Sequence, residues 1–121
     1  MKNRHFGQSI VCAARGIVQG FRSERNFKIY CLLVSIFLIF NILLSVGVYD
    51  YIILIVLTGN AFALEYVNTA IERVVDRFGK GIDVDCKFIK DVAAGAVLVS
   101  GIVFFLVEGI ILIPRLVERL L

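Results

Sequence analysis

The sequence has few of the residues on which disulfide frameworks and metal clusters depend. Its 121 residues include no tryptophan, one proline, one histidine and three cysteines. The cysteines are odd in number, far apart and without metal-ligand spacing, so neither a disulfide framework nor a zinc site is expected. We interpret Cys12, Cys31 and Cys86 as small apolar or surface residues, and His5 as an interfacial residue rather than a ligand.

The motifs by which soluble proteins bind nucleotides are also missing. There is no G-x-x-x-x-G-K-[ST], no G-x-G-x-x-G after a strand, and no H-R-D or D-F-G set. The G-K-G at 79–81 is too short to count, and Asp83 with Asp85 gives only the start of a calcium loop. These absences exclude P-loop proteins and the soluble protein kinases.

Long runs without charge indicate an integral membrane protein of one domain, residues 1–121. The apolar fraction is 60%, against roughly 45–50% in soluble domains. About 20 apolar residues cross a hydrocarbon core as a helix, which places spans at about 29–49, 51–75 and 91–113. The third run contains one charge, Glu108, whose role the sequence leaves open, and Pro114 is expected to end that helix.

The N-terminal segment is expected to form a fourth, different helix. From about residue 5 to 22, apolar side chains recur at steps of three and four beside a basic flank, which predicts an amphipathic helix in the membrane interface. The alternative is a soluble helix packed against other protein. No cleavable signal peptide is expected, and Ser23 is expected to cap the helix that follows, with Asn26 in an incomplete capping box.

The distribution of basic residues predicts the topology. Three spans place the N-terminus and the 77–91 segment on one side, which holds eleven of the 13 Lys and Arg residues. The other side holds only Arg115 and Arg119. The positive-inside rule makes the richer side cytoplasmic, in the plasma membrane. Glu24, the only acid among the first 49 residues, lies at this side.

One face of the second expected span is polar. On a helix of 3.6 residues per turn, four side chains fall within roughly 80° of each other around the axis. They are Glu65, Asn68, Glu72 and Asp76. An ionisable group at membrane depth costs at least ~2.5 kcal/mol by insertion scales, so Glu65 is expected to have a function. A structural polar seam against a neighbouring helix is the alternative.

Carboxylates beside lysines at a membrane surface suit a divalent cation and a polyphosphate. Mg²⁺ is held by one or two carboxylates plus phosphate oxygens. Glu24 and either Glu72 or Asp76 could supply those carboxylates, and Lys90 could neutralise phosphate charge. Glu65 lies about two turns deeper than Glu72, where a lipid hydroxyl could give it a proton. The residues alone therefore indicate a membrane enzyme or a transporter.

Three stretches resemble the prokaryotic diacylglycerol kinases, a family of small three-span membrane kinases. The first is E-x-x-N-T-A-I-E-x-x-x-D at Glu65–Asp76, which is similar to the family signature. The second is K-D-V-A-A-G-A-V at Lys90–Val97, and the third is S-E-R-N-F at Ser23–Phe27. The similarity covers nearly the whole chain, and the motifs follow in order without gaps between them.

The resemblance implies an all-α homotrimer with active sites between protomers, ATP as phosphoryl donor and Mg²⁺ as cofactor. By position, Glu65 would be the catalytic base, and Glu24 and Glu72 would bind metal; one or two metal ions stay open. The resemblance also implies a catalytic or nucleotide-binding role for Asn68, Asp76, Lys90, Asp91, Gly81, Ile82 and Asp83. The family's N-terminal basic residue falls at His5 or at Arg4.

The family divides by its lipid substrate, diacylglycerol or undecaprenol, and the second and third motifs look more like the undecaprenol branch. Ala13 and Ala94 stand where members of the other branch have serines near the lipid glycerol. Gln19 is the nearest polar residue that could contact the lipid. We therefore expect Mg-ATP-dependent phosphorylation of undecaprenol, with diacylglycerol as the alternative. A small proton-coupled transporter, which needs a fourth span, and a non-enzymatic membrane subunit are the competing classes.

Overall fold

The computed structural model describes residues 5–78 and 84–121, and these ranges are helical almost throughout. The four helices are α1 (Phe6–Ser23), α2 (Arg25–Leu43), α3 (Val48–Phe78) and α4 (Val84–Leu120). Three of them, α2, α3 and α4, are long and apolar enough to cross a membrane. The expected all-α fold of three spans and an N-terminal helix is confirmed.

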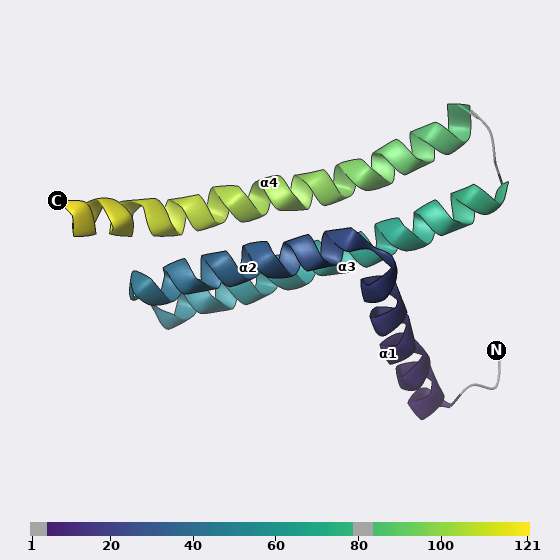
Figure 1. Cartoon of the computed structure of the whole chain (residues 1–121), viewed down its shortest axis with the longest axis horizontal. Helices are drawn as coiled ribbons and strands as arrows, with labels where there is room; N and C mark the ends of the chain where they lie inside the picture. The colour runs from purple at the N-terminus through teal and green to yellow at the C-terminus, as the bar shows by residue number, and fades with distance from the viewer. Residues whose placement is uncertain (1–4, 79–83) are drawn as a thin grey trace.

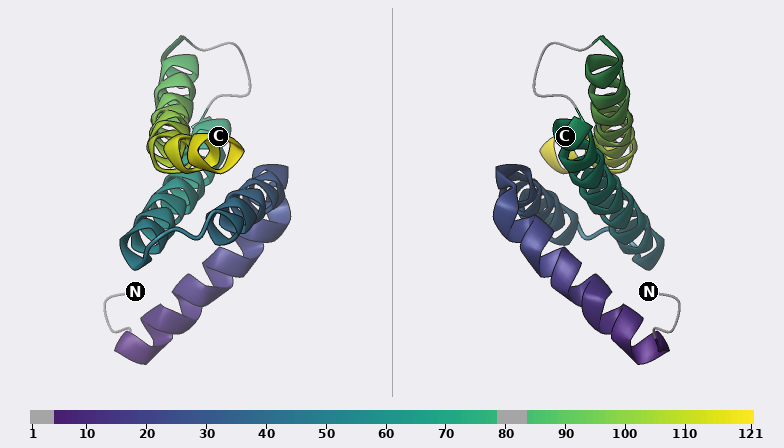
Figure 2. Two further views of the ribbon diagram at one scale, coloured as in Figure 1. Left: turned by 90° about the vertical axis from the view of Figure 1, so that its left-hand side faces the viewer. Right: turned by 90° about the vertical axis from the view of Figure 1, so that its right-hand side faces the viewer.

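The three long helices run side by side, and α1 leaves them at a steep angle (Figure 1). Of all the helix pairs, α3 and α4 pack most extensively. The α2–α3 turn and the C-terminus lie at one end of the molecule, and the ends of α3 and α4 that flank residues 79–83 lie at the other (Figure 1). Figure 2 shows α1 extending to one side of the long helices. The chain therefore has two ends, which carry different polar groups.

The turn between the first two spans comes earlier than the sequence predicts. We expected the first span to continue to residue 49, but α2 ends at Leu43 and α3 begins at Val48. Ser45 takes a positive φ of 54°, which ends the helix. The Asp50 carboxylate accepts a hydrogen bond of 3.1 Å from the Gly47 N–H, so it stabilises the start of α3.

The expected end of the last helix at Pro114 is wrong, because α4 continues through this proline to Leu120. A proline inside a helix costs about 3 kcal/mol or more, so other contacts must hold the last turns. Arg115 Nη2 lies 3.0 Å from Asp50 Oδ2, and Arg119 Nη2 donates to Ser45 Oγ at 3.2 Å. Both arginines bind the α2–α3 turn region, which keeps the segment after Pro114 helical and in place.

The expected cap of α2 is also wrong. Glu24 occupies the N-cap position and makes no capping hydrogen bond with its side chain. The Ser23 hydroxyl instead donates to the Gly20 carbonyl oxygen at 3.0 Å, within α1. Asn26 does not complete a capping box; its side chain points to α3, as described below.

α1 is docked on α3 through Tyr66. The Tyr66 hydroxyl donates to the Ile17 carbonyl oxygen at 3.0 Å, and its ring lies 4.2 Å, centroid to centroid, from the buried ring of Phe27. Gly20 faces the Tyr66 ring without a side chain of its own. Phe21 also stacks on Phe27, and most other apolar residues of α1 are exposed, including Phe6, Ile10, Val11, Ile17 and Val18. An exposed apolar side of this kind suits the predicted membrane interface.

The buried interior is thin and contains several polar groups. Its fully or nearly buried apolar side chains are Phe27, Val46, Leu54, Val75, Phe104 and Leu112. Most other large apolar residues of α2, α3 and α4 are exposed, as expected for helices that face lipid. The buried polar residues are Asn41, Glu65, Asn68, Ser100 and Glu108. Ionisable groups inside a membrane bundle usually mark functional sites, so Glu65 and Glu108 require an explanation.

Candidate active site

Glu65 is a buried carboxylate held between two helices. Its side chain on α3 is 2% exposed. The Tyr30 hydroxyl donates to Glu65 Oε2 at 3.0 Å, and Asn26 Nδ2 donates to Oε1 at 3.3 Å, both from α2. Each carboxylate oxygen thus accepts one hydrogen bond. These two donors fix the orientation of the Glu65 carboxylate.

Asn68 and Glu72 continue the polar face of α3 toward the end with residues 79–83. Asn68 Nδ2 donates to Glu72 Oε1 at 3.3 Å, one turn along the helix. Asn68 is only 7% exposed, and its Oδ1 atom has no hydrogen-bond partner among the described residues. The amide therefore turns its nitrogen toward Glu72 and leaves its buried oxygen unpaired.

Asp76 and Lys90 lie at the outer end of this face. The Lys90 ammonium group lies 2.5 Å from Asp76 Oδ1 and joins α4 to α3. Lys87 pairs with Asp91 in the same way along α4. All four side chains are exposed or half-exposed, so these pairs contribute little to stability and are open to a charged ligand. The face therefore passes from a buried carboxylate to exposed charges over three turns of α3.

Other expected site residues are not brought together in the single chain. Glu24 is half-buried at the α1–α2 junction. Among the residues that the structure describes, no group of three or more His, Cys, Asp or Glu side chains forms a metal site. Ala13 and Gln19 on α1 and Ala94 on α4 are exposed. The expected positions Arg4, Gly81, Ile82 and Asp83 lie outside the described residues, and His5 is exposed at the start of α1.

Comparison with known proteins shows the family of this chain. The family described as prokaryotic diacylglycerol kinase matches residues 11–112. This chain belongs to the prokaryotic diacylglycerol kinase family. It is 37% identical over 114 residues to an undecaprenol kinase of Bacillus subtilis, covering 94% of this chain and 92% of the relative. It is 33% identical over 104 residues to a diacylglycerol kinase of Synechocystis, covering 85% of this chain and 59% of the relative.

Membership of this family makes the protein a lipid kinase and a multi-pass membrane protein, with ATP as its phosphoryl donor. No solved structure matches the chain significantly. The transporter class is set aside, because both relatives are named as kinases and the described residues contain three candidate spans.

The sequence reasoning missed the residues that orient Glu65. Asn26 was interpreted as part of a capping box, and Tyr30 was not singled out. The two are four residues apart and so lie on one face of α2, where both reach Glu65. A polar pair at this spacing, at the start of an otherwise apolar helix, is the signal that could have identified them. Tyr66, which anchors α1 next to Glu65, was also missed, because its contacts are with residues of other helices, Ile17 and Phe27.

Proposed function

We propose that this lipid kinase phosphorylates undecaprenol to undecaprenyl phosphate at the cytoplasmic face of the plasma membrane. The observation that carries the proposal is Glu65, a buried carboxylate at membrane depth whose two oxygens are held by Tyr30 and Asn26. A carboxylate held in this way can accept the proton of a lipid hydroxyl that approaches from the bilayer.

In the proposed reaction, the hydroxyl oxygen of the lipid attacks the γ-phosphorus of ATP. Its proton passes to the Glu65 carboxylate, the bond between the γ-phosphorus and the bridging oxygen breaks, and ADP leaves. Phosphoryl transfer depends mainly on positioning and charge stabilisation. Glu65 positions the nucleophile, and Lys90 would neutralise charge on the transferred phosphate.

The exposed outer part of the face would bind the nucleotide. Glu72 and Glu24 would hold Mg²⁺ together with the ATP phosphates, and bound Mg²⁺ would stabilise negative charge on those phosphates. The buried Asn68 Oδ1, unpaired next to Glu72, supports a ligand at this point. The remaining proposed nucleotide and catalytic residues are Asp76, Asp91, Gly81, Ile82 and Asp83.

Undecaprenol is the preferred acceptor because the surrounding positions offer few hydrogen bonds. Ala13 and Ala94 are exposed and have no polar side-chain atoms, and Gln19 is the polar candidate on α1. The extra ester oxygens of diacylglycerol would be buried unpaired at roughly 1–3 kcal/mol each. Undecaprenol has one hydroxyl, which Glu65 alone can satisfy. The identity to the Bacillus subtilis undecaprenol kinase supports this choice, and the Synechocystis relative keeps diacylglycerol as the second candidate.

We further propose that the active unit is a homotrimer. In the single chain, Glu24 lies at the α1–α2 junction, and no three His, Cys, Asp or Glu side chains come together among the described residues, so a second protomer would complete the metal site. On α4, a Cβ atom built at Gly95 would meet nothing within 4 Å, so the chain itself leaves room for a close helix contact there. Native mass spectrometry from mild detergent should give a trimer. A fully active monomer would contradict this assembly.

The function is tested with purified protein, ATP, Mg²⁺ and each lipid in mixed micelles. With the two lipids at equal mole fraction, turnover of undecaprenol should exceed turnover of diacylglycerol by tenfold or more. A tenfold preference corresponds to about 1.4 kcal/mol. Glu65→Gln should lower turnover by about 10²–10⁴-fold while nucleotide binding stays near normal, because the general base is lost. Glu118→Gln, at an exposed acid at the end of α4 away from the candidate active site, is the matched control.

Two outcomes separate the parts of the proposal. Retention of more than about a tenth of wild-type turnover in Glu65→Gln would remove Glu65 from the role of base. Equal or better turnover of diacylglycerol by the wild-type protein would overturn the choice of lipid and leave the lipid kinase activity in place.

A further inference from the structure

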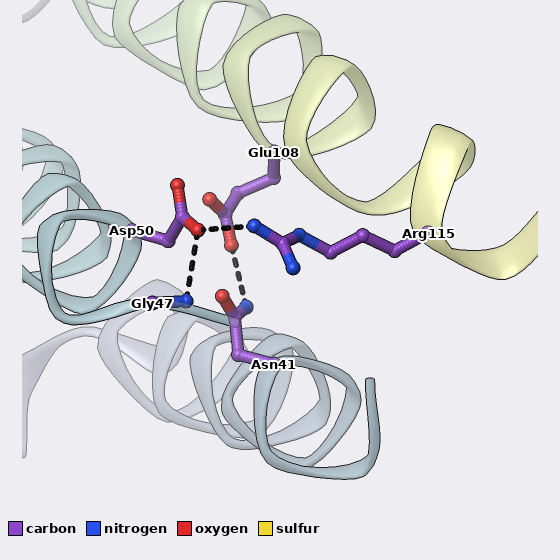
Figure 3. Close-up of polar contacts among 5 residues, drawn as sticks. All are labelled: Asn41, Gly47, Asp50, Glu108 and Arg115. Carbon is purple, nitrogen blue, oxygen red and sulfur yellow. Dashed lines mark hydrogen bonds and ion pairs between the residues drawn. The ribbon is translucent and has the colours of Figure 1, made fainter. Parts of the chain in front are cut away.

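Glu108 is a second buried carboxyl group, at the end of the helices away from the candidate active site. It lies on α4 and is 0% exposed, as is Asn41 on α2. Asn41 Nδ2 donates to Glu108 Oε1 at 2.9 Å (Figure 3). The proposed lipid kinase reaction does not use this group, and an unpaired charge at such a position is unfavourable. Glu108 therefore needs either a cation or a proton.

The charges around Glu108 do not balance. α2 contributes only the neutral Asn41, and α3 contributes the carboxylate of Asp50, which is seen beside the pair in Figure 3. On α4, the guanidinium group of Arg115 is bound to Asp50 Oδ2 at 3.0 Å (Figure 3). Arg119 binds Ser45 on the α2–α3 turn, and Glu118 shares a surface pocket with Asp50 and Arg115. Arg115 thus neutralises Asp50, and an ionised Glu108 would leave one negative charge in excess.

Two oxygen atoms of the Glu108–Asn41 pair lack a partner. Glu108 Oε2 and Asn41 Oδ1 are both buried and form no hydrogen bond with any described residue. Both are acceptors when Glu108 is ionised, so neither can satisfy the other. A proton on Oε2 turns it into a donor and also removes the excess charge.

A metal ion fits this place less well than a proton. Mg²⁺ and Ca²⁺ take six or more oxygen ligands, mostly carboxylates, carbonyls and water. In the described part of the chain, no three His, Cys, Asp or Glu side chains come together. A proton needs only one donor oxygen and one acceptor, which the pair provides.

We propose that Glu108 and Asn41 form a buried proton-binding site, in which Glu108 is held as the neutral acid. After rotation about its soft terminal torsion, the Oε2–H group donates to Asn41 Oδ1, while Oε1 keeps the hydrogen bond from Asn41 Nδ2. The two side chains then form a closed acid–amide pair that joins α4 to α2. The ion pair of Asp50 and Arg115 next to it stays balanced.

This site makes the stability of the far end depend on pH. A glutamate in an unfolded chain ionises near pH ~4.3, so at higher pH the folded chain holds one proton that the unfolded chain lacks. The unfolding equilibrium constant should therefore rise by up to about tenfold per pH unit above that range, until the folded acid ionises. Glu108→Gln keeps both hydrogen bonds with a neutral amide, so this contribution should disappear while the pair remains.

The test compares wild type, Glu108→Gln and the control Glu118→Gln, each labelled with ¹³C-glutamate and purified in one detergent. Near pH ~7, where a free glutamate is ionised, isotope-edited infrared spectra of wild type and Glu118→Gln should show the carbonyl band of a protonated glutamate. Glu108→Gln should lack this band. Thermal unfolding measured over a range of pH should lose a slope of about one proton in Glu108→Gln and keep it in Glu118→Gln.

Absence of a protonated-glutamate band in wild type would overturn the proposal. A band that appears only when Na⁺ and other metal ions are removed would show a cation site instead, which overturns it as well. If Glu108→Gln does not fold, the test uses the protonated-glutamate band of wild type and of Asn41→Ala, which requires no stable variant of Glu108. A change in the frequency of this band in Asn41→Ala supports the proposal, and an unchanged frequency contradicts it.

Discussion

Gly20 offers a direct test of the packing that places α1 next to the candidate active site. A Cβ atom at this position would lie 2.8 Å from Cε1 and 2.9 Å from Cδ1 of Tyr66, whereas ordinary contact begins at 3.4 Å. The ring cannot retreat freely, because its hydroxyl is bound to Ile17 and its face lies on the buried Phe27. In Gly20→Ala, either Tyr66 or α1 must move.

The size of the effect follows from a comparison with Gly16 on the same helix. A Cβ at Gly16 meets nothing within 4 Å. Both alanine variants gain about 1 kcal/mol of helix propensity, so their difference isolates the clash. Inserting a methyl group into a packed contact costs about 1–3 kcal/mol, or roughly five- to 150-fold in the docking equilibrium of α1.

The assay is hydrogen exchange of the α1 amides, with lipid kinase turnover measured on the same samples. Gly20→Ala should exchange faster than Gly16→Ala and show a higher KM for the lipid, because α1 carries Ala13 and Gln19, which are proposed to lie near the lipid. Gly16→Ala should match or exceed wild type in protection. Equal exchange and equal lipid KM in the two variants would refute the role of the Gly20–Tyr66 contact.

Two further results are expected from the site. The variants Glu24→Gln and Glu72→Gln should each raise the Mg²⁺ concentration that gives half-maximal turnover, because each removes a carboxylate from a shared cation. The control Glu118→Gln should leave this concentration unchanged. Normal nucleotide binding by Glu24→Gln and by Glu72→Gln at low Mg²⁺ would show that the metal lies elsewhere. Ala13→Ser combined with Ala94→Ser should narrow the preference for undecaprenol over diacylglycerol, because hydroxyl groups are restored near the glycerol. An unchanged preference in mixed micelles would separate these two positions from the lipid.

Local patterns in the sequence were sufficient for the fold class and for much of the candidate site. Uncharged runs predict membrane spans from sequence alone, because each charged residue by itself makes burial in lipid less favourable. Helical periodicity placed Glu65, Asn68 and Glu72 on one face of α3, and the structure has the hydrogen bond between Asn68 and Glu72 that this spacing allows. The motif resemblance led to the same family that the comparisons show.

These local patterns did not predict the contacts between helices. Glu65 accepts its two hydrogen bonds from Asn26, which is 39 residues away in the chain, and from Tyr30, which is 35 residues away. Periodicity shows which side of a helix a residue occupies but not which helix that side meets. The role of Asn26 was therefore misread from its neighbours in sequence.

The far end of the molecule shows the same division. Pro114 is a helix breaker by local rules, yet α4 continues because Arg115 and Arg119 bind the α2–α3 turn region. Glu108 was only an isolated charge in an apolar run, and its pairing with Asn41 spans 67 residues. The sequence by itself determined which segments enter the membrane and which of their sides are polar, since both depend on local composition and helical spacing. Only the tertiary structure decided the partner of each polar group, because that depends on how the helices pack.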